Sequence, residues 1–87
     1  MSVRDTLDQR GQHYGRFADV AEISQSIKDL YYIGASYSKM DSDQREALDM
    51  IANKLARLLN GNPHHYDSWH DIAGYAELVA QRLKPSP

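Results

Sequence analysis

Residues 41–63 read DSDQREALDMIANKLARLLNGNP, and this stretch decides the fold. Its apolar residues recur at steps of three and four, the pattern of an amphipathic helix. The aspartate and serine at its start can each cap the helix, and Gly61 and Pro63 end it because proline cannot continue a helix. The stretch therefore predicts a helix over 42–60. Its apolar side consists of Leu48, Ile51, Ala52, Leu55, Leu58 and Leu59.

The same periodicity predicts a helix on each side of this stretch. One covers 17–33 and ends at Gly34, and the other covers 67–83. No segment shows sustained two-residue alternation, so we expect no sheet. In the last helix we expect one main apolar side to face the core, namely Trp69, Ile72, Ala73, Ala76, Val79, Ala80 and Leu83.

Residues 1–16 form an N-terminal arm, in which we expect a short helix over 5–10 followed by a loop. That loop would contain His13 and Tyr14. The 87 residues are enough for one domain, 1–87, so the predicted fold class is all-α, a small antiparallel helical bundle. A chain of this size is marginally stable by itself and has no cysteine for a disulfide. We therefore expect oligomerisation to complete the core.

The helix over 67–83 has a second side that predicts a subunit interface. At about 100° per residue, Gly74, Tyr75 and Leu78 lie roughly opposite the main apolar side. Glycine costs about 1 kcal/mol relative to alanine inside a helix, so Gly74 indicates close approach of another backbone. We expect this side to pack against a further element or a second subunit.

Charge and hydropathy exclude two classes of partner. The chain has 10 Lys and Arg against 12 Asp and Glu, and this balance argues against binding to a nucleic-acid duplex. No apolar run is long enough to span a bilayer, and the N-terminus lacks the apolar stretch of a signal peptide. The expected location is the cytoplasm, which would be the host cell cytoplasm if a phage encodes the chain.

Acidic residues near the junction of the last two helices are candidate metal ligands. Asp67 and Asp71 are one helical turn apart, and Asp49 could join them from the preceding helix. Carboxylates placed so closely repel one another unless a cation such as Mg²⁺ lies between them. The alternative on spacing alone is that Asp67 caps its helix while Asp71 accepts a hydrogen bond or faces solvent.

Basic and aromatic residues are candidate ligand-binding groups. Lys54 and Arg57 could hold a phosphate, or they could cover the edge of the core and pair with the neighbouring aspartates. His13 and Tyr14 suit a loop that stacks on a nucleobase, although a simple turn explains them equally well. Trp69 is a further stacking candidate. The four histidines lack the repeated ligand spacing of a metal site.

Two segments carry a resemblance to known proteins. ALDMIANKLAR (47–57) and DSWHDIAGYA (67–76) resemble small phage and prophage proteins of unassigned function, which also carry a Tyr-Gly pair like Tyr14-Gly15. The resemblance extends over roughly 10–83. More distantly, the arrangement is similar to the MazG-like all-α nucleoside triphosphate pyrophosphohydrolases.

The MazG-like resemblance implies a helical bundle that oligomerises and binds Mg²⁺ through acidic residues on two consecutive helices. The family pattern is Glu-Glu-x-x-Glu on one helix and Glu-x-x-Asp on the next. Asp71 matches the last aspartate, whereas Ser68 stands where the family has glutamate. The earlier helix offers only Glu46 and Asp49.

Three functions follow from these residues. We predict that the chain binds a nucleotide or a partner at the junction of the last two helices without cleaving it. The first alternative is a Mg²⁺-dependent nucleoside triphosphate pyrophosphohydrolase, with the metal on the three aspartates, phosphates on Lys54 and Arg57, and the base near Tyr14 or Trp69. The second alternative is a purely structural oligomeric interaction protein.

Overall fold

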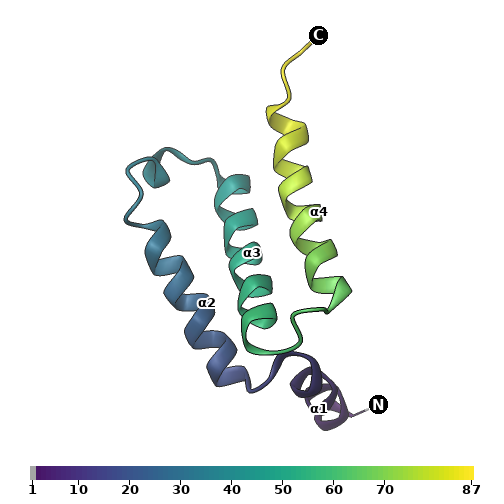
Figure 1. Ribbon diagram of the computed structural model, residues 1–87. Coiled ribbons are helices and arrows are strands. Elements are labelled where there is room, and N and C mark those ends of the chain that lie inside the picture. Colours follow the sequence, from purple (N-terminus) through teal and green to yellow (C-terminus); the bar gives the residue numbers. More distant parts are fainter. Residues whose placement is uncertain (1) are drawn as a thin grey trace.

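The computed structural model describes residues 2–87, and every regular element in them is helical. No strand occurs in this range, which confirms the predicted all-α class. In chain order the elements are α1 (Val3–Tyr14), α2 (Phe17–Tyr31), the 3-10 turn η1 (Tyr37–Lys39), α3 (Ser42–Asn60) and α4 (Tyr66–Leu83) (Figure 1).

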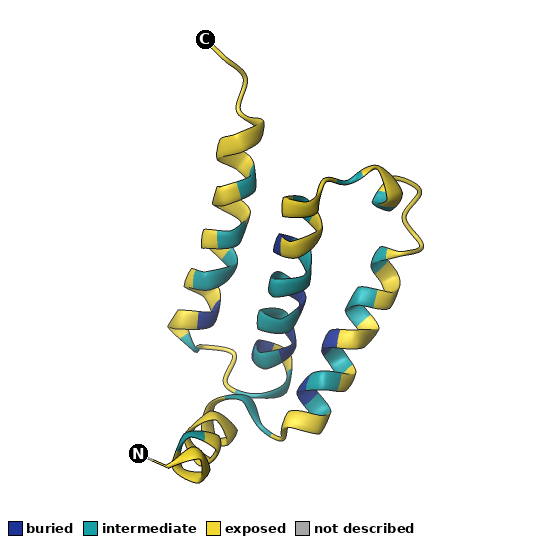
Figure 2. Cartoon of the chain, turned by 180° about the vertical axis from the view of Figure 1, so that it is seen from behind, coloured by how far each residue is buried: buried dark blue, intermediate teal, exposed yellow. Residues whose placement is uncertain are grey.

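Three of the helices form a single open layer, with α3 between α2 and α4 (Figures 1 and 2). Neighbouring helices run antiparallel, and α1 lies across the end of the layer where α2 begins. Alanines let the helices approach closely. Ala52 and Ala56 of α3 are fully buried, and the rest of the buried apolar core is Val20, Ala47 and Leu58.

The N-terminal helix is longer than the sequence predicted. Ser2 caps it: its hydroxyl accepts a hydrogen bond from the Asp5 N–H at 3.1 Å, and the Asp5 carboxylate accepts one from the Ser2 N–H. From this start α1 continues to Tyr14. The prediction that His13 and Tyr14 lie in a loop is therefore wrong, because they form the last turn of a helix.

The predicted core side of α4 is confirmed at Ile72 and Val79 only. Trp69 is 54% exposed and Leu83 is 51% exposed, and the alanines between them are exposed too. The side that packs on α3 contains Ser68, which is buried, and the half-buried Ile72, Tyr75 and Val79. The difference arises because α4 has a single neighbour in the layer, so much of its apolar surface is left uncovered.

Side chains connect the helices at the other end of the layer. Arg82 of α4 contacts Asp43 through Nε, and its Nη2 lies 3.0 Å from an Asp41 carboxylate oxygen. On the α2 side, the Tyr31 hydroxyl donates to the Leu48 carbonyl at 2.9 Å.

Among the described helices, none is both long and apolar enough to cross a membrane.

Candidate functional site

The end of α1 is joined to the end of α3 by two hydrogen bonds. The Asn62 N–H donates to the His13 carbonyl at 2.7 Å, and the Asn60 side-chain amide donates to the Tyr14 carbonyl at 3.0 Å. These bonds satisfy the free carbonyls that every helix leaves at its C-terminus. They fix α1 against α3 at a defined angle, and we call this contact the α1–α3 junction.

Two glycines make this close approach possible. A Cβ atom on Gly61 would lie 2.1 Å from the His13 carbonyl oxygen, so only glycine fits there. Gly15 has φ +81°, and a Cβ atom on it would lie 2.6 Å from the Asn60 side-chain nitrogen. The Tyr14-Gly15 pair noted in the sequence thus serves to turn the chain from α1 into α2 against Asn60.

The Tyr14 ring lies between two polar side chains at this junction. The guanidinium carbon of Arg57 is 4.5 Å from the ring centroid, a cation–π contact. The His65 ring meets Tyr14 edge-on at 5.4 Å, and His65 Nδ1 is 3.0 Å from the Ser68 hydroxyl. The structure therefore brings together Tyr14 and Arg57, two of the five residues predicted to bind a ligand.

A cavity of about 510 Å³ opens between α1, α2 and α3 beside these two residues. Its volume falls within the roughly 300–1,000 Å³ typical of small-molecule sites. Leu7 and Val20 supply apolar lining. The polar and aromatic lining, which we call the basic pocket, consists of Arg10, Tyr14, Arg16, Phe17, Asn53 and Arg57.

The basic pocket concentrates positive charge in a chain whose formal net charge is −2. Three of its lining residues are arginines, and no lining residue in the described part of the chain is acidic. The nearest acidic contact we identify is Asp19, 3.9 Å from the exposed Arg16. Guanidinium groups with free donors and aromatic rings beside them suit a ligand that combines an anion with a flat ring.

The three aspartates predicted as metal ligands are not brought together within the chain. Asp49 lies on the side of α3 that faces α2, whereas Asp71 faces α3 from α4. Burial raises the pKa of the Tyr31 phenol, and the nearby Asp49 carboxylate raises it further. Among residues 2–87, no group of three His, Asp or Glu side chains is placed to hold a metal ion.

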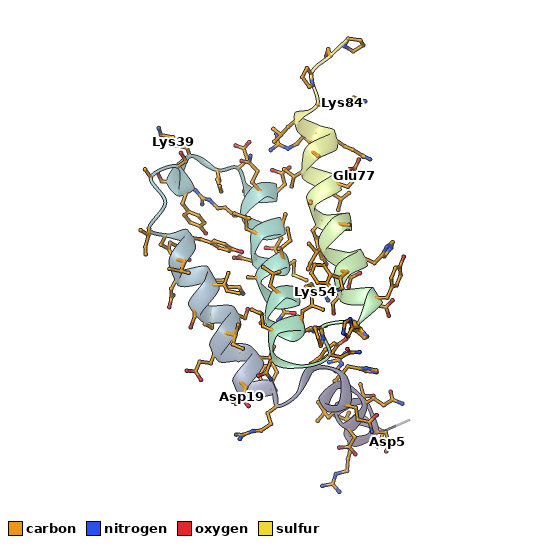
Figure 3. All side chains as sticks on the ribbon, viewed as in Figure 1. Asp5, Asp19, Lys39, Lys54, Glu77 and Lys84 are labelled. Atoms are coloured by element: carbon orange, nitrogen blue, oxygen red, sulfur yellow. The ribbon has the colours of Figure 1, made fainter. Side chains whose placement is uncertain are left out.

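Lys54 is engaged in an ion pair rather than free for a phosphate. Its ammonium nitrogen lies 3.2 Å from an Asp71 carboxylate oxygen, and its side chain is only 12% exposed between α3 and α4 (Figure 3). This is the structural alternative that the spacing left open. Removing either partner would leave the other charge half-buried and unpaired.

The remaining predicted residues lie outside the basic pocket. The His13 ring is 4.9 Å from the His65 ring, next to Tyr14 but not among the pocket lining. The Trp69 indole N–H donates to the Pro63 carbonyl at 2.9 Å. Gly74 and Leu78 are exposed and Tyr75 is half-buried, and together with His70 and Asp71 they line a shallow hollow of about 390 Å³.

Sequence reasoning missed four of the pocket residues. Arg10 is four residues before Tyr14, and Asn53 is four before Arg57, so each pair shares one side of a helix. This spacing was available in the sequence, but an N-terminal helix ending at residue 10 obscured the first pair. Arg16 and Phe17 follow the turn at Gly15, and no local pattern shows where that turn directs them.

Comparison with known proteins places the chain in a family without assigning it an activity. No curated protein and no solved structure matches it. A family match does extend over residues 4–83, which includes the α1–α3 junction, the basic pocket and all of α4. The chain therefore belongs to the family described as Domain of unknown function (DUF6378).

Proposed function

We propose that the protein binds an anionic ligand with an aromatic ring, of the nucleotide class, in the basic pocket. One observation carries this proposal: three arginines and two aromatic rings line a cavity of about 510 Å³. A guanidinium group binds phosphate oxygens in pairs, and Tyr14 or Phe17 offers a face on which a base can stack. The site lies between α1, α2 and α3 rather than at the α3–α4 junction.

Binding is a better proposal than hydrolysis for the isolated chain. Hydrolysis between phosphates needs metal ions that neutralise charge and activate water. The candidate carboxylates do not meet, because Asp49 of α3 faces α2 whereas Asp71 of α4 faces α3 and already pairs with Lys54. A MazG-like pyrophosphohydrolase, with Mg²⁺ as its cofactor, therefore stays the second proposal.

We also propose that the protein is a homo-oligomer. The observation that favours this is the open layer, because a domain normally buries the apolar sides of its helices in a second layer. Ligand binding and assembly are compatible in one protein, since they use different surfaces.

A nucleotide panel tests the binding proposal. Nucleoside mono-, di- and triphosphates are added to the purified chain with and without Mg²⁺, and its melting temperature and the heat of binding are measured. A ligand that binds only the folded state raises the melting temperature in proportion to ln(1 + [L]/Kd). Release of pyrophosphate, measured in parallel, would favour the hydrolase instead.

Charge-removing variants locate the site. Arg10→Gln and Arg16→Gln change exposed side chains, and each removes a charge-assisted hydrogen bond worth about 1.5–3 kcal/mol, so we expect roughly tenfold or greater weakening. Arg4→Gln is the matched control, since it removes an exposed arginine of α1 that does not line the pocket. Equal weakening by the control, or no response to any nucleotide, would contradict the proposal.

A further inference from the structure

The chain exposes more surface than a closed domain of its size. Its radius of gyration is 15.0 Å, whereas a compact domain of this length has about 12 Å. Its accessible surface is 6517 Å², which is about 1,300 Å² more than the roughly 5,200 Å² typical of a folded monomer of 9.9 kDa. The single layer of helices contributes to this excess, together with the exposed α1 and the extended C-terminal segment 84–87.

Apolar side chains cover one side of this layer. On α2 and α3 they include Leu30, which is 65% exposed, Leu59, which is 71% exposed, and the half-buried Leu48 and Leu55. On α4 a seam of exposed residues continues them, with steps of four, three, four and three. The seam consists of Trp69, Ala73, Ala76, Ala80 and Leu83. We call these side chains the apolar face.

Helix geometry puts all three groups on the same side of the layer. Viewed down α3 from its N-terminus, Leu55 lies about a quarter-turn clockwise from Lys54, which faces α4. α4 runs the opposite way, so in the same view its residues advance anticlockwise. Ala76 therefore lies about a quarter-turn anticlockwise from Tyr75, which faces α3. Both turns end on the same side. On α2, the buried Ser24 faces α3. Leu30 follows it by six residues, a net rotation of about a third of a turn, and lies on the same side of the layer as Leu55 and Ala76.

The other side of the layer is polar. About 100° per residue places Lys28 of α2, Glu46 and Arg57 of α3, and Asp67 and His70 of α4 there. The helices therefore have one side that water solvates well and one side that lacks charged groups on α3 and α4. Only the apolar face needs a partner.

We infer that the apolar face packs against the same face of a second copy of this chain, forming a two-layered dimer of six core helices. This inference deepens the proposed self-association by naming its surface and its stoichiometry. An excess of about 1,300 Å² per chain matches an obligate homodimer, which buries about 1,000–2,500 Å² per subunit. The parts of this face on α3 and α4 carry no charge and can meet their own copy across a twofold axis without repulsion. On α2, Asp19 lies within about 20° of Leu30 and pairs with Arg16 at 3.9 Å.

The α4 seam gives the dimer its closest contact. Three alanines at heptad-like spacing present a shallow surface that another helix backbone can approach, and Trp69 and Leu83 flank them with large side chains. The predicted interface at Gly74, Tyr75 and Leu78 lies on a different side of α4. A Cβ atom on Gly74 would meet nothing within 4 Å, so no backbone of the same chain approaches it.

Mass and tryptophan fluorescence of the full chain test the inference. Light scattering after gel filtration should give twice the 9.9 kDa of one chain. Trp69 is the one tryptophan, so its emission should be blue-shifted and protected from iodide, and should become red-shifted and quenchable as dilution dissociates the dimer. A mass of one chain with a quenchable Trp69 would overturn both the dimer and the proposed self-association.

Two substitutions on the same helix decide which surface is used. Ala76→Glu places a charge in the seam, at a residue that is exposed in the single chain, and Leu78→Glu places one on the side of the earlier predicted interface. We expect Ala76→Glu to give a monomer, or a chain that unfolds for lack of its partner, while Leu78→Glu remains a dimer. A dimer that tolerates Ala76→Glu would keep self-association but overturn the apolar face as its surface.

Discussion

The two ends of the helical layer are held together by different kinds of contact. At the α1–α3 junction, backbone groups meet directly and two glycines leave no room for an added atom. At the opposite end, Arg82 reaches Asp41 and Asp43 through exposed side chains. The first end is fixed by shape and the second by charge. The basic pocket lies beside the first end, where the backbone contacts hold Tyr14 and Arg57 in place.

Gly61→Ala should have the largest effect on stability. The new Cβ atom would lie 2.1 Å from the His13 carbonyl oxygen and 2.4 Å from the Tyr14 Cα atom, so backbone must move. We expect a loss of about 3 kcal/mol in the free energy of unfolding, at the upper end for overpacking. Urea unfolding followed by circular dichroism, at one fixed protein concentration, measures it.

Gly74→Ala is the matched control for that substitution. Gly74 lies inside α4 with nothing near its Cβ position, so alanine should stabilise the protein by about 0.5–1 kcal/mol. Opposite signs for the two glycines would establish that shape fixes the α1–α3 junction. A loss at Gly74 would instead indicate that another molecule approaches this position, as the sequence first predicted.

Gly15→Ala should have an intermediate effect. Its φ of +81° is strained for any other residue, and the added Cβ atom would press on the Asn60 side chain, so we expect a loss of about 2 kcal/mol. Asn60→Ala alone should cost about 1 kcal/mol through the lost hydrogen bond to Tyr14.

The double variant Gly15→Ala with Asn60→Ala separates the two causes of that loss. Removing the Asn60 amide relieves the contact but not the backbone strain, so the double variant should be more stable than the sum of the single losses predicts. Strict additivity would mean that the strain at Gly15 accounts for the whole effect. Urea midpoints of the four proteins give the coupling.

Local patterns in the sequence predicted α2, α3 and α4 well because caps and periodicity are local, whereas α1 is longer than predicted. The start of α3 at Ser42 and its end at Asn60 are confirmed, and Gln44 accepts a hydrogen bond from the Asp41 N–H at 2.7 Å as an N-terminal cap. α2 ends at Tyr31, two residues before the predicted end, and α4 begins one residue earlier than predicted. These boundaries depend on neighbours within a few residues.

The tertiary arrangement was less predictable because periodicity shows which side of a helix is apolar but not what covers it. The Trp69–Leu83 side of α4 has the right pattern for a core, yet no helix of its own chain lies against it. The pairing of Tyr14 with Arg57 was anticipated only as a shared ligand set. Tyr14 meets Arg57 because Gly15 and Gly61 let two backbone segments touch. These glycines are 46 residues apart in the sequence, so no local pattern links them.

Arg82→Gln should have the smallest effect on the free energy of unfolding, and this effect should depend on salt and pH because it comes from ion pairs. The Arg82 guanidinium lowers the pKa of the Asp43 carboxyl below its ordinary 3.8, mainly through a hydrogen bond. The resulting contribution to the free energy of unfolding is complete above pH 3.8, the ordinary pKa of the carboxyl. It is lost as the pH falls through the lower pKa that Asp43 has in the folded protein. The stability difference between wild type and Arg82→Gln should therefore be small at pH 7, decrease with added salt and disappear in acid.

The cost of Asn60→Ala involves no titrating group and should stay constant under the same changes. If both variants responded equally to salt and pH in urea unfolding, the contrast between an end fixed by shape and an end fixed by charge would be wrong.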